Sequence, residues 1–237
     1  MERPRSERKM PNLLIISVCN TYAGTKDALP GVNEDIKLMK SLNIDLNVRV
    51  HVFENMGKDE LLKRLDEYVR HYGKDGKSPE VNTIIFHYSG HGYRSEIDRF
   101  EGFFDNDKQR VGLMEVLGKF SKYARLMCVF DGCRSESKSI TSTDYDKITN
   151  VSTILLYGSS KGETCYATKK GSYLTMAFCD AFKKQKPLPT YMRTGDLVKL
   201  TMATVMSYRI LLKDRTPKFY LSKFVREKFK ELTDLIS

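Results

Sequence analysis

The chain has 237 residues, of which 41% are hydrophobic and 30% are charged, proportions that are typical of a soluble globular protein. A chain of this length can bury a full core, so we expect one large α/β domain rather than two small ones. No apolar run approaches the roughly 20 residues of a membrane helix, so we expect no membrane span.

The formal net charge of +10 is concentrated near the C-terminus, where 13 Lys and Arg residues face 5 Asp and Glu residues from Lys183 onward. Such an excess can attract nucleic acid, anionic lipid or an acidic partner. Here the basic residues are mixed with acidic ones, and no nucleic-acid-binding motif accompanies them. Nucleic acid is therefore not an expected partner.

The five cysteines are scattered, with no CxxC pair and no even framework, which predicts reduced thiols in a cytoplasmic protein. Cys128 and Cys179 lie in apolar runs and are expected in the core. Residues 1–10 are rich in Arg, and the apolar run after them is too short for a signal peptide. We expect these ten residues to form a mobile tail.

Hydrophobic periodicity predicts strands that alternate with helices. The expected strands are residues 12–19, 45–53, the first parts of 82–92 and 125–135, 151–157 and 218–221. The expected helices are one that begins near Asn33 and those at 59–72, 111–120, 172–184, 196–211 and 223–236. A hairpin is expected around residues 100–107.

This alternation indicates a mostly parallel sheet with helices on both faces, a three-layer αβα sandwich. Residues 59–72 show the helical pattern, with Leu61 and Leu65 on one face. Residues 45–53 instead carry apolar residues at every second position, as in a half-buried strand. No internal repeat or low-complexity segment interrupts the pattern.

Two of the expected strands end in short turns that each carry one reactive side chain. The first turn is Tyr-Ser-Gly-His-Gly around His91, and the second is Asp-Gly-Cys-Arg-Ser around Cys133, 42 residues later. Neighbouring parallel strands end at the same edge of a sheet, so the imidazole and the thiol are expected to meet there.

A cysteine attacks as a thiolate, and a thiol with an ordinary pKa near 8.5 is mostly protonated at neutral pH. His91 can take this proton and return it to a leaving amine. The backbone N–H groups of Gly92 and Cys133 are candidates for an oxyanion hole, worth about 3 kcal/mol per donor. This chemistry needs no cofactor and predicts a cysteine peptidase.

These residues allow two other interpretations. His87 and His91 are four residues apart, as in a zinc-binding HExxH helix, but the glutamate is absent and Ser-Gly would break the helix. We therefore expect no metal site and assign His87 a structural role. A cysteine after an apolar strand is often a core residue, but the turn around Cys133 is polar, which favours a nucleophile.

The two turns resemble the histidine and cysteine turns of caspase-fold peptidases, and are more similar to those of metacaspases and paracaspases than to those of animal caspases. The resemblance extends over nearly the whole chain after residue 11, including residues 29–35, 158–174 and 215–219. It implies a six-stranded, mainly parallel sheet, a His91–Cys133 dyad, and oxyanion donors at Gly92 and Cys133.

The resemblance also implies a substrate preference. Aspartate-cutting caspases carry an arginine in the cleft segment, where this chain has Cys-Tyr-Ala at 165–167. Metacaspases and paracaspases use acidic residues and cut after Arg or Lys. Asp35 (or Glu34) and Asp131 match two such acids, and Glu163 is a substitute for a third, so cleavage after a basic P1 residue is expected.

By the same resemblance, residues 11–237 form a single peptidase domain, with a large-subunit-like part at 11–133, an exposed linker loop at 134–150 and a small-subunit-like part at 151–237. Lys138 and Lys147 in the loop are candidate sites of self-cleavage. Protein or peptide substrates are the expected partners, and homodimerisation stays open. Calcium activation also stays open. The candidate acids do not have the spacing of a known calcium-binding loop; they are Asp98, Glu101, Asp105 and Asp107.

One rival function remains. Caspase-fold domains that have lost the dyad act as scaffolds or adaptors, but this chain carries both dyad members, which favours an enzyme.

Overall fold

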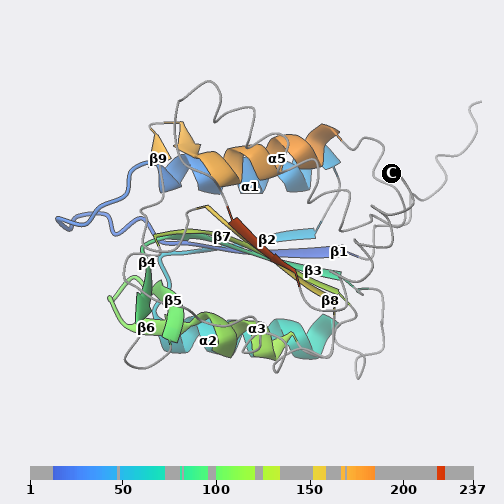
Figure 1. The fold of residues 1–237 in the computed structure, drawn as a ribbon, viewed down its shortest axis with the longest axis horizontal. Coiled ribbons are helices and arrows are strands. Elements are labelled where there is room, and N and C mark those ends of the chain that lie inside the picture. The colour runs from blue at the N-terminus through green and yellow to red at the C-terminus, as the bar shows by residue number, and fades with distance from the viewer. Residues whose placement is uncertain are drawn as a thin grey trace, which may run out of the picture.

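A six-stranded sheet in the order β11-β8-β7-β3-β1-β2 organises the fold (Figure 1). Five of its strands are parallel, and β11 pairs with β8 in the antiparallel sense. The computed structural model describes residues 13–46, 49–72, 81, 83–95, 100–120, 125–133, 152–158, 167–168, 170–184 and 218–221.

The strands of the main sheet are β1 (Leu13–Cys19), β2 (Arg49–Glu54), β3 (Thr83–Gly90), β7 (Arg125–Gly132), β8 (Ser152–Tyr157) and β11 (Lys218–Leu221). The helices are α1 (Val32–Leu46), α2 (Lys58–Tyr72), α3 (Leu113–Lys119) and α5 (Tyr173–Lys184). Two small antiparallel sheets complete the described part, formed by β4 (Gly92–Ser95), β5 (Phe100–Phe104) and β6 (Arg110–Gly112), and by β9 (Ala167–Thr168) and β10 (Gly171–Ser172).

Helices cover the main sheet on both faces, with α1 and α5 on one side and α2 and α3 on the other (Figure 1). Successive residues of a strand point to opposite faces, so each central strand supplies both cores. In β3, Ile84, Phe86 and Tyr88 join the core under α2 and α3, whereas Ile85 joins the core under α1 and α5. Burial on both faces explains why these strands are almost continuously apolar in sequence.

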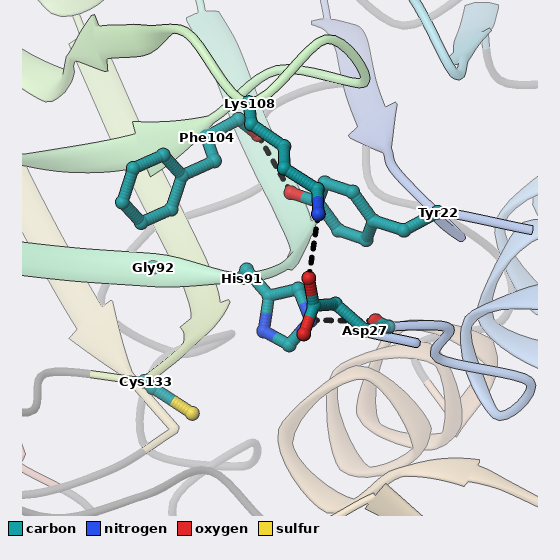
Figure 2. A pocket seen from close by; sticks show the side chains of 7 residues that line it. All are labelled: Tyr22, Asp27, His91, Gly92, Phe104, Lys108 and Cys133. Carbon is teal, nitrogen blue, oxygen red and sulfur yellow. Dashed lines mark hydrogen bonds and ion pairs between the residues drawn. The ribbon is translucent and has the colours of Figure 1, made fainter. Parts of the chain in front are cut away.

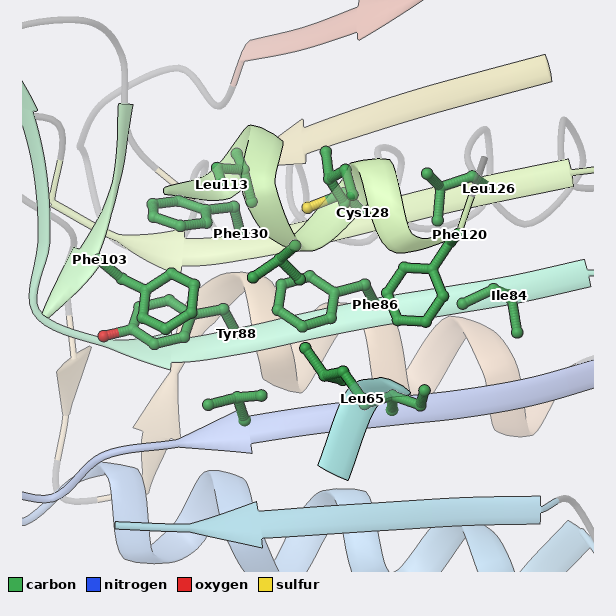
Figure 3. Close-up of a cluster of buried hydrophobic side chains, with 14 of the residues drawn as sticks. Leu65, Ile84, Phe86, Tyr88, Phe103, Leu113, Phe120, Leu126, Cys128 and Phe130 are labelled. Carbon is green, nitrogen blue, oxygen red and sulfur yellow. The ribbon is translucent and has the colours of Figure 1, made fainter. Parts of the chain in front are cut away.

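Aromatic rings fill the core on the α2–α3 face (Figure 3). The Tyr88 ring stacks on that of Phe103, with centroids 4.2 Å apart, and on that of Phe130 at 5.1 Å. Phe103 belongs to β5, so this stack fastens the small β4–β5–β6 sheet to the carboxyl ends of β3 and β7. The segment that follows His91 is thereby held against the main sheet.

The expected fold class, an αβα sandwich with a six-stranded, mainly parallel sheet, is confirmed. The helices at 59–72 and 172–184 and the expected strands are present, with boundaries that shift by a few residues. The hairpin expected around residues 100–107 corresponds to β5 and β6.

Two predicted boundaries were wrong. The strand expected from residue 45 begins at Arg49, because α1 continues to Leu46. Leu42 and Leu46 are four residues apart, a spacing that fits a helix as well as alternation fits a strand. The helix expected from residue 111 begins at Leu113, because Val111 pairs with Phe103 in the small sheet.

Several predictions lie outside the described residues. They are the tail at 1–10, the loop at 134–150 and the helices at 196–211 and 223–236.

Candidate active site

The parallel register of β3 and β7 brings the two reactive turns together. Ser89 pairs with Asp131 and Gly90 with Gly132, so the residues that follow these pairs are His91 on the first strand and Cys133 on the second. Both line a pocket of about 370 Å³, together with Tyr22, Asp27, Gly92, Phe104 and Lys108. Figure 2 shows the His91 ring and the Cys133 sulfur on this pocket.

Glycine is required where the two turns approach each other. A methyl group on Gly92 would collide with the backbone carbonyl oxygen of Cys133 and with the Phe130 ring. A methyl group on Gly90 would collide with the Tyr88 hydroxyl. Gly92 therefore lets the His91 turn pack closely against the Cys133 turn, and Gly90 leaves room for the Tyr88 hydroxyl.

The His91 ring is held in one tautomer by the backbone. Its Nε2 lies 2.7 Å from the carbonyl oxygen of Asp27, and a carbonyl can only accept a hydrogen bond. Nε2 therefore carries the proton, and in the neutral ring Nδ1 is the basic nitrogen. The Tyr22 ring packs against the imidazole, with centroids 4.7 Å apart.

The backbone of His91 is also anchored. Its carbonyl oxygen accepts hydrogen bonds from the Tyr88 hydroxyl at 2.8 Å and from the Phe104 amide at 3.0 Å. The Tyr22 hydroxyl donates to the Phe104 carbonyl at 2.7 Å. Burial raises the pKa of both tyrosines, so these phenols keep their protons and remain donors.

Tyr22 has a φ of +50°, a conformation that non-glycine residues seldom adopt. Its side chain is nevertheless tied into the site by the ring contact and hydrogen bond described above. The cost of this backbone conformation, of the order of 1 kcal/mol, is offset by those contacts.

Asp35 is the acid of α1 that points toward the sheet. It is fully buried, and its Oδ2 accepts hydrogen bonds at 2.6 Å from the hydroxyls of Ser89 and Ser172. Its Oδ1 accepts the Ser172 amide at 2.8 Å. Burial raises the pKa of this carboxyl, and the hydrogen bonds oppose that rise. Glu34, the alternative acid, instead forms an ion pair with Lys37 at the surface.

Asp131 lies beside Asp35, because Ser89 pairs with Asp131 across β3 and β7 and also donates to Asp35. Asp131 is 3% exposed, and its Oδ2 accepts the backbone amide of Thr175 at 2.9 Å and the Thr175 hydroxyl at 2.8 Å. The structure thus brings together two of the three acids predicted to bind the P1 residue, although neither lines the pocket that His91 and Cys133 share. Glu163 lies outside the described residues.

Both acids contact the beginning of α5, since Ser172 precedes that helix and Thr175 is its third residue. The N–H groups of the first helical turn need acceptors, and negative charge is favourable there. Asp35 and Asp131 therefore have a structural role in fastening α5 to the sheet, beside any role in binding substrate.

With this geometry in place, a comparison with known families is informative: residues 13–228 match the caspase domain. The chain belongs to the caspase domain family. The match supports a cysteine-type peptidase. A search of curated proteins gave no match.

Gly92 and Cys133, the predicted oxyanion donors of this caspase domain, both line the pocket. Gly92 begins β4 and Cys133 directly follows β7, so their backbones meet where the two sheets meet. An oxyanion role for their amides remains a prediction.

His87 is buried between β1 and α5 and does not line the pocket. Its Nδ1 lies 2.8 Å from the Ser17 hydroxyl and its Nε2 lies 2.9 Å from the Thr175 hydroxyl. Burial lowers the pKa of this imidazole to about 3. Among the described residues, no group of three or more His, Cys, Asp or Glu is arranged to hold a metal ion.

The other described cysteines of the caspase domain, Cys19, Cys128 and Cys179, are buried, whereas Cys133 is partly exposed. Burial raises the pKa of all three buried thiols. They are therefore unreactive core residues, as expected for Cys128 and Cys179. The fifth, Cys165, is outside the described residues.

Of the candidate acids for calcium, Asp105 has a structural role. Its two carboxylate oxygens accept the backbone amides of Lys58 and Gln109, both at 2.6 Å. It thereby accepts a backbone N–H at the beginning of α2 and closes the turn between β5 and β6.

Among the described residues, no helix is long and apolar enough to cross a membrane.

Sequence patterns did not indicate the other residues that line the pocket, which are Tyr22, Asp27, Phe104 and Lys108. The Asp27 carboxylate forms an ion pair with Lys108 at 2.6 Å, which lowers the pKa of Asp27 (Figure 2). The pair joins the loop after β1 to the β5–β6 turn. Because the Asp27 carbonyl holds the His91 ring, this surface pair is placed to steady the predicted base.

We expect Lys108→Met to lower kcat on a peptide substrate about threefold to tenfold, because the Asp27 loop gains freedom to move its carbonyl away from His91. Peptidase assays at constant ionic strength would measure this. As a control, Lys26→Met removes one positive charge from the exposed residue next to Asp27, and it should change kcat less than twofold. Unchanged activity of Lys108→Met would contradict the proposed link, and the exchange Asp27→Lys with Lys108→Asp should restore part of the loss.

The lowered pKa of His87 predicts a pH-dependent stability. Between pH 6.5 and about 3 the unfolded chain protonates this histidine and the folded chain does not, so the free energy of unfolding falls as pH falls. Between pH 6.5 and 5, the free energy of unfolding measured in urea should fall by about 2 kcal/mol more for the wild type than for His87→Gln. Equal slopes for the wild type and His87→Gln would contradict the assignment.

Proposed function

We propose that this caspase domain is a cysteine endopeptidase of the metacaspase or paracaspase type, which uses His91 and Cys133 to hydrolyse peptide bonds after Arg or Lys. The observation that carries the proposal is the His91 ring, fixed through Nε2 by the Asp27 carbonyl on a pocket that Cys133 shares. This arrangement leaves Nδ1 as the base for the thiol.

In the proposed reaction, His91 takes the Cys133 proton, and the thiolate attacks the substrate carbonyl carbon. The carbonyl oxygen becomes an oxyanion, which the Gly92 and Cys133 amides stabilise. Protonated His91 then gives its proton to the leaving amine, and a thioester remains. Water, deprotonated by His91, attacks the thioester and releases the acid and the free thiol. No cofactor takes part.

The preference for a basic P1 residue rests on Asp35 and Asp131. An arginine side chain has five N–H donors and binds carboxylates in a fixed, forked geometry. Two buried acids next to Ser89, one bonded to its hydroxyl and one paired with it across β3 and β7, provide an acceptor set of the matching charge.

Glu163, the third predicted acid, enters the proposal on its position in sequence alone. The proposed location is the cytoplasm, where the reduced state of the buried thiols would be maintained. The proposed partners are protein or peptide substrates.

The first experiment compares the wild type with Cys133→Ala and His91→Ala on fluorogenic peptides that end in Arg, Lys or Asp. We expect cleavage after Arg and Lys, with kcat lowered at least ~1000-fold in both variants, because each removes one half of the dyad. Cys179→Ala, at a buried cysteine distant from the dyad in sequence, should retain activity.

Two results would contradict this proposal. Preferred cleavage after Asp would overturn the basic specificity, and a folded wild type with no cleavage and no labelling of Cys133 by a peptidyl electrophile would favour the scaffold function. Labelling that His91→Ala abolishes would support the dyad even for a slow enzyme.

Self-cleavage is a separate prediction, because residues 134–150 contain two lysines after which the enzyme could cut. We expect purified wild type to divide within this segment, and Cys133→Ala to stay intact. Replacement of both Lys138 and Lys147 by Gln should prevent the division, as seen by gel electrophoresis and N-terminal sequencing. A wild type that stays intact while fully active would contradict self-processing but leave the peptidase function standing.

A further inference from the structure

Five polar side chains form a continuous buried chain of hydrogen bonds that ends on Asp131. In order, the chain passes through Cys19, Ser17, His87, Thr175 and Asp131, with distances of 3.3, 2.8, 2.9 and 2.8 Å. None of the five is more than 3% exposed. The chain crosses from β1 through β3 and α5 to β7, so it links four elements of the fold.

The direction of each hydrogen bond follows from the carboxylate end. The Thr175 hydroxyl donates its single hydrogen to Asp131 Oδ2. The Thr175 oxygen must then accept from His87 Nε2, which places the imidazole proton there. His87 Nδ1 is left as an acceptor for Ser17, and the Ser17 oxygen accepts from the Cys19 thiol. Every donor therefore points toward Asp131.

Packing alone does not require this chain. On the same face of the sheet, the neighbouring strand residues Ile85, Met127 and Val129 are apolar and form an ordinary core with α5. A buried polar group costs free energy unless all its hydrogen bonds are made, so apolar residues would serve equally well at Ser17 and His87. The polar chain instead ends on Asp131, a predicted substrate-binding acid near the carboxyl end of β7.

We propose that Thr175 and His87 are positioning residues that fix the Asp131 carboxylate for recognition of a P1 cation. His87, held by Ser17, orients the Thr175 hydroxyl, and the Thr175 hydroxyl and amide together hold Oδ2. An acid with a fixed orientation binds a guanidinium without first losing the entropy of ordering. This inference rests on the proposed basic specificity and names residues through which that specificity is set.

The test measures charge recognition separately from catalysis. Two fluorogenic peptides that differ only in P1, arginine in one and the neutral isostere citrulline in the other, are compared by kcat/KM. Thr175→Val keeps the side-chain shape and the backbone amide but removes the hydroxyl. We expect the arginine-to-citrulline ratio to fall about tenfold through a higher KM for the arginine peptide, with citrulline cleavage changed less than twofold.

Thr175→Ser restores the hydroxyl and should return the ratio to within about threefold of wild type. Ser17→Ala, at the far side of His87, should lower the ratio about threefold, and it decides the question if Thr175→Val does not fold. Thermal unfolding and titration of Cys133 with a peptidyl electrophile confirm that the compared proteins are folded and active.

The outcomes separate this inference from the proposed function. An arginine-to-citrulline ratio near one for the wild type would overturn both the proposed basic specificity and the positioning role. A wild-type ratio well above one that Thr175→Val and Ser17→Ala leave unchanged would overturn the positioning role alone. The positioning role is likewise overturned if the variants cleave both peptides with an equally lowered kcat. That result is expected of residues that only fasten α5 to the sheet.

Discussion

The parallel pairing of β3 with β7 is the constraint on which the site depends. This register sets Ser89 opposite Asp131 and Gly90 opposite Gly132, so the turns that carry His91 and Cys133 leave the sheet side by side. Because side chains alternate between faces, a slip of one residue would turn every side chain of β3 to the wrong face. The aromatic residues on one face and the polar residues on the other both oppose such a slip.

The two faces of β3 have different tasks near its carboxyl end. On the α2–α3 face, Tyr88 packs on aromatic rings and its hydroxyl holds the His91 carbonyl, so this face steadies the base. On the α1–α5 face, side chains change from apolar Ile85 to His87 and Ser89, which bond to Thr175 and Asp35. The groups proposed for catalysis and those proposed for substrate binding thus lie at the same edge of the sheet, while the residues that support them lie on opposite faces.

Buried polar groups with several partners make the site rigid. Asp35 has three hydrogen bonds from Ser89 and Ser172, and the chain through His87 ends on Asp131. These bonds also join α5 to α1 and to the sheet, so the groups proposed to read the substrate help to hold the fold. A loss of activity after a change in one of them therefore needs a measurement that separates binding from stability.

The sequence by itself determined the layered fold and the two reactive turns, because buried parallel strands are apolar throughout and end in glycine-rich segments that local patterns reveal. It also singled out Asp35 and Asp131, through the resemblance to caspase-fold peptidases. Only the tertiary structure disclosed Asp27 and Thr175. Asp27 holds His91 through a backbone carbonyl, which every residue type possesses, and Thr175 meets Asp131 from a helix 44 residues away. Contacts of this kind leave no local pattern, since they arise only when distant segments pack together.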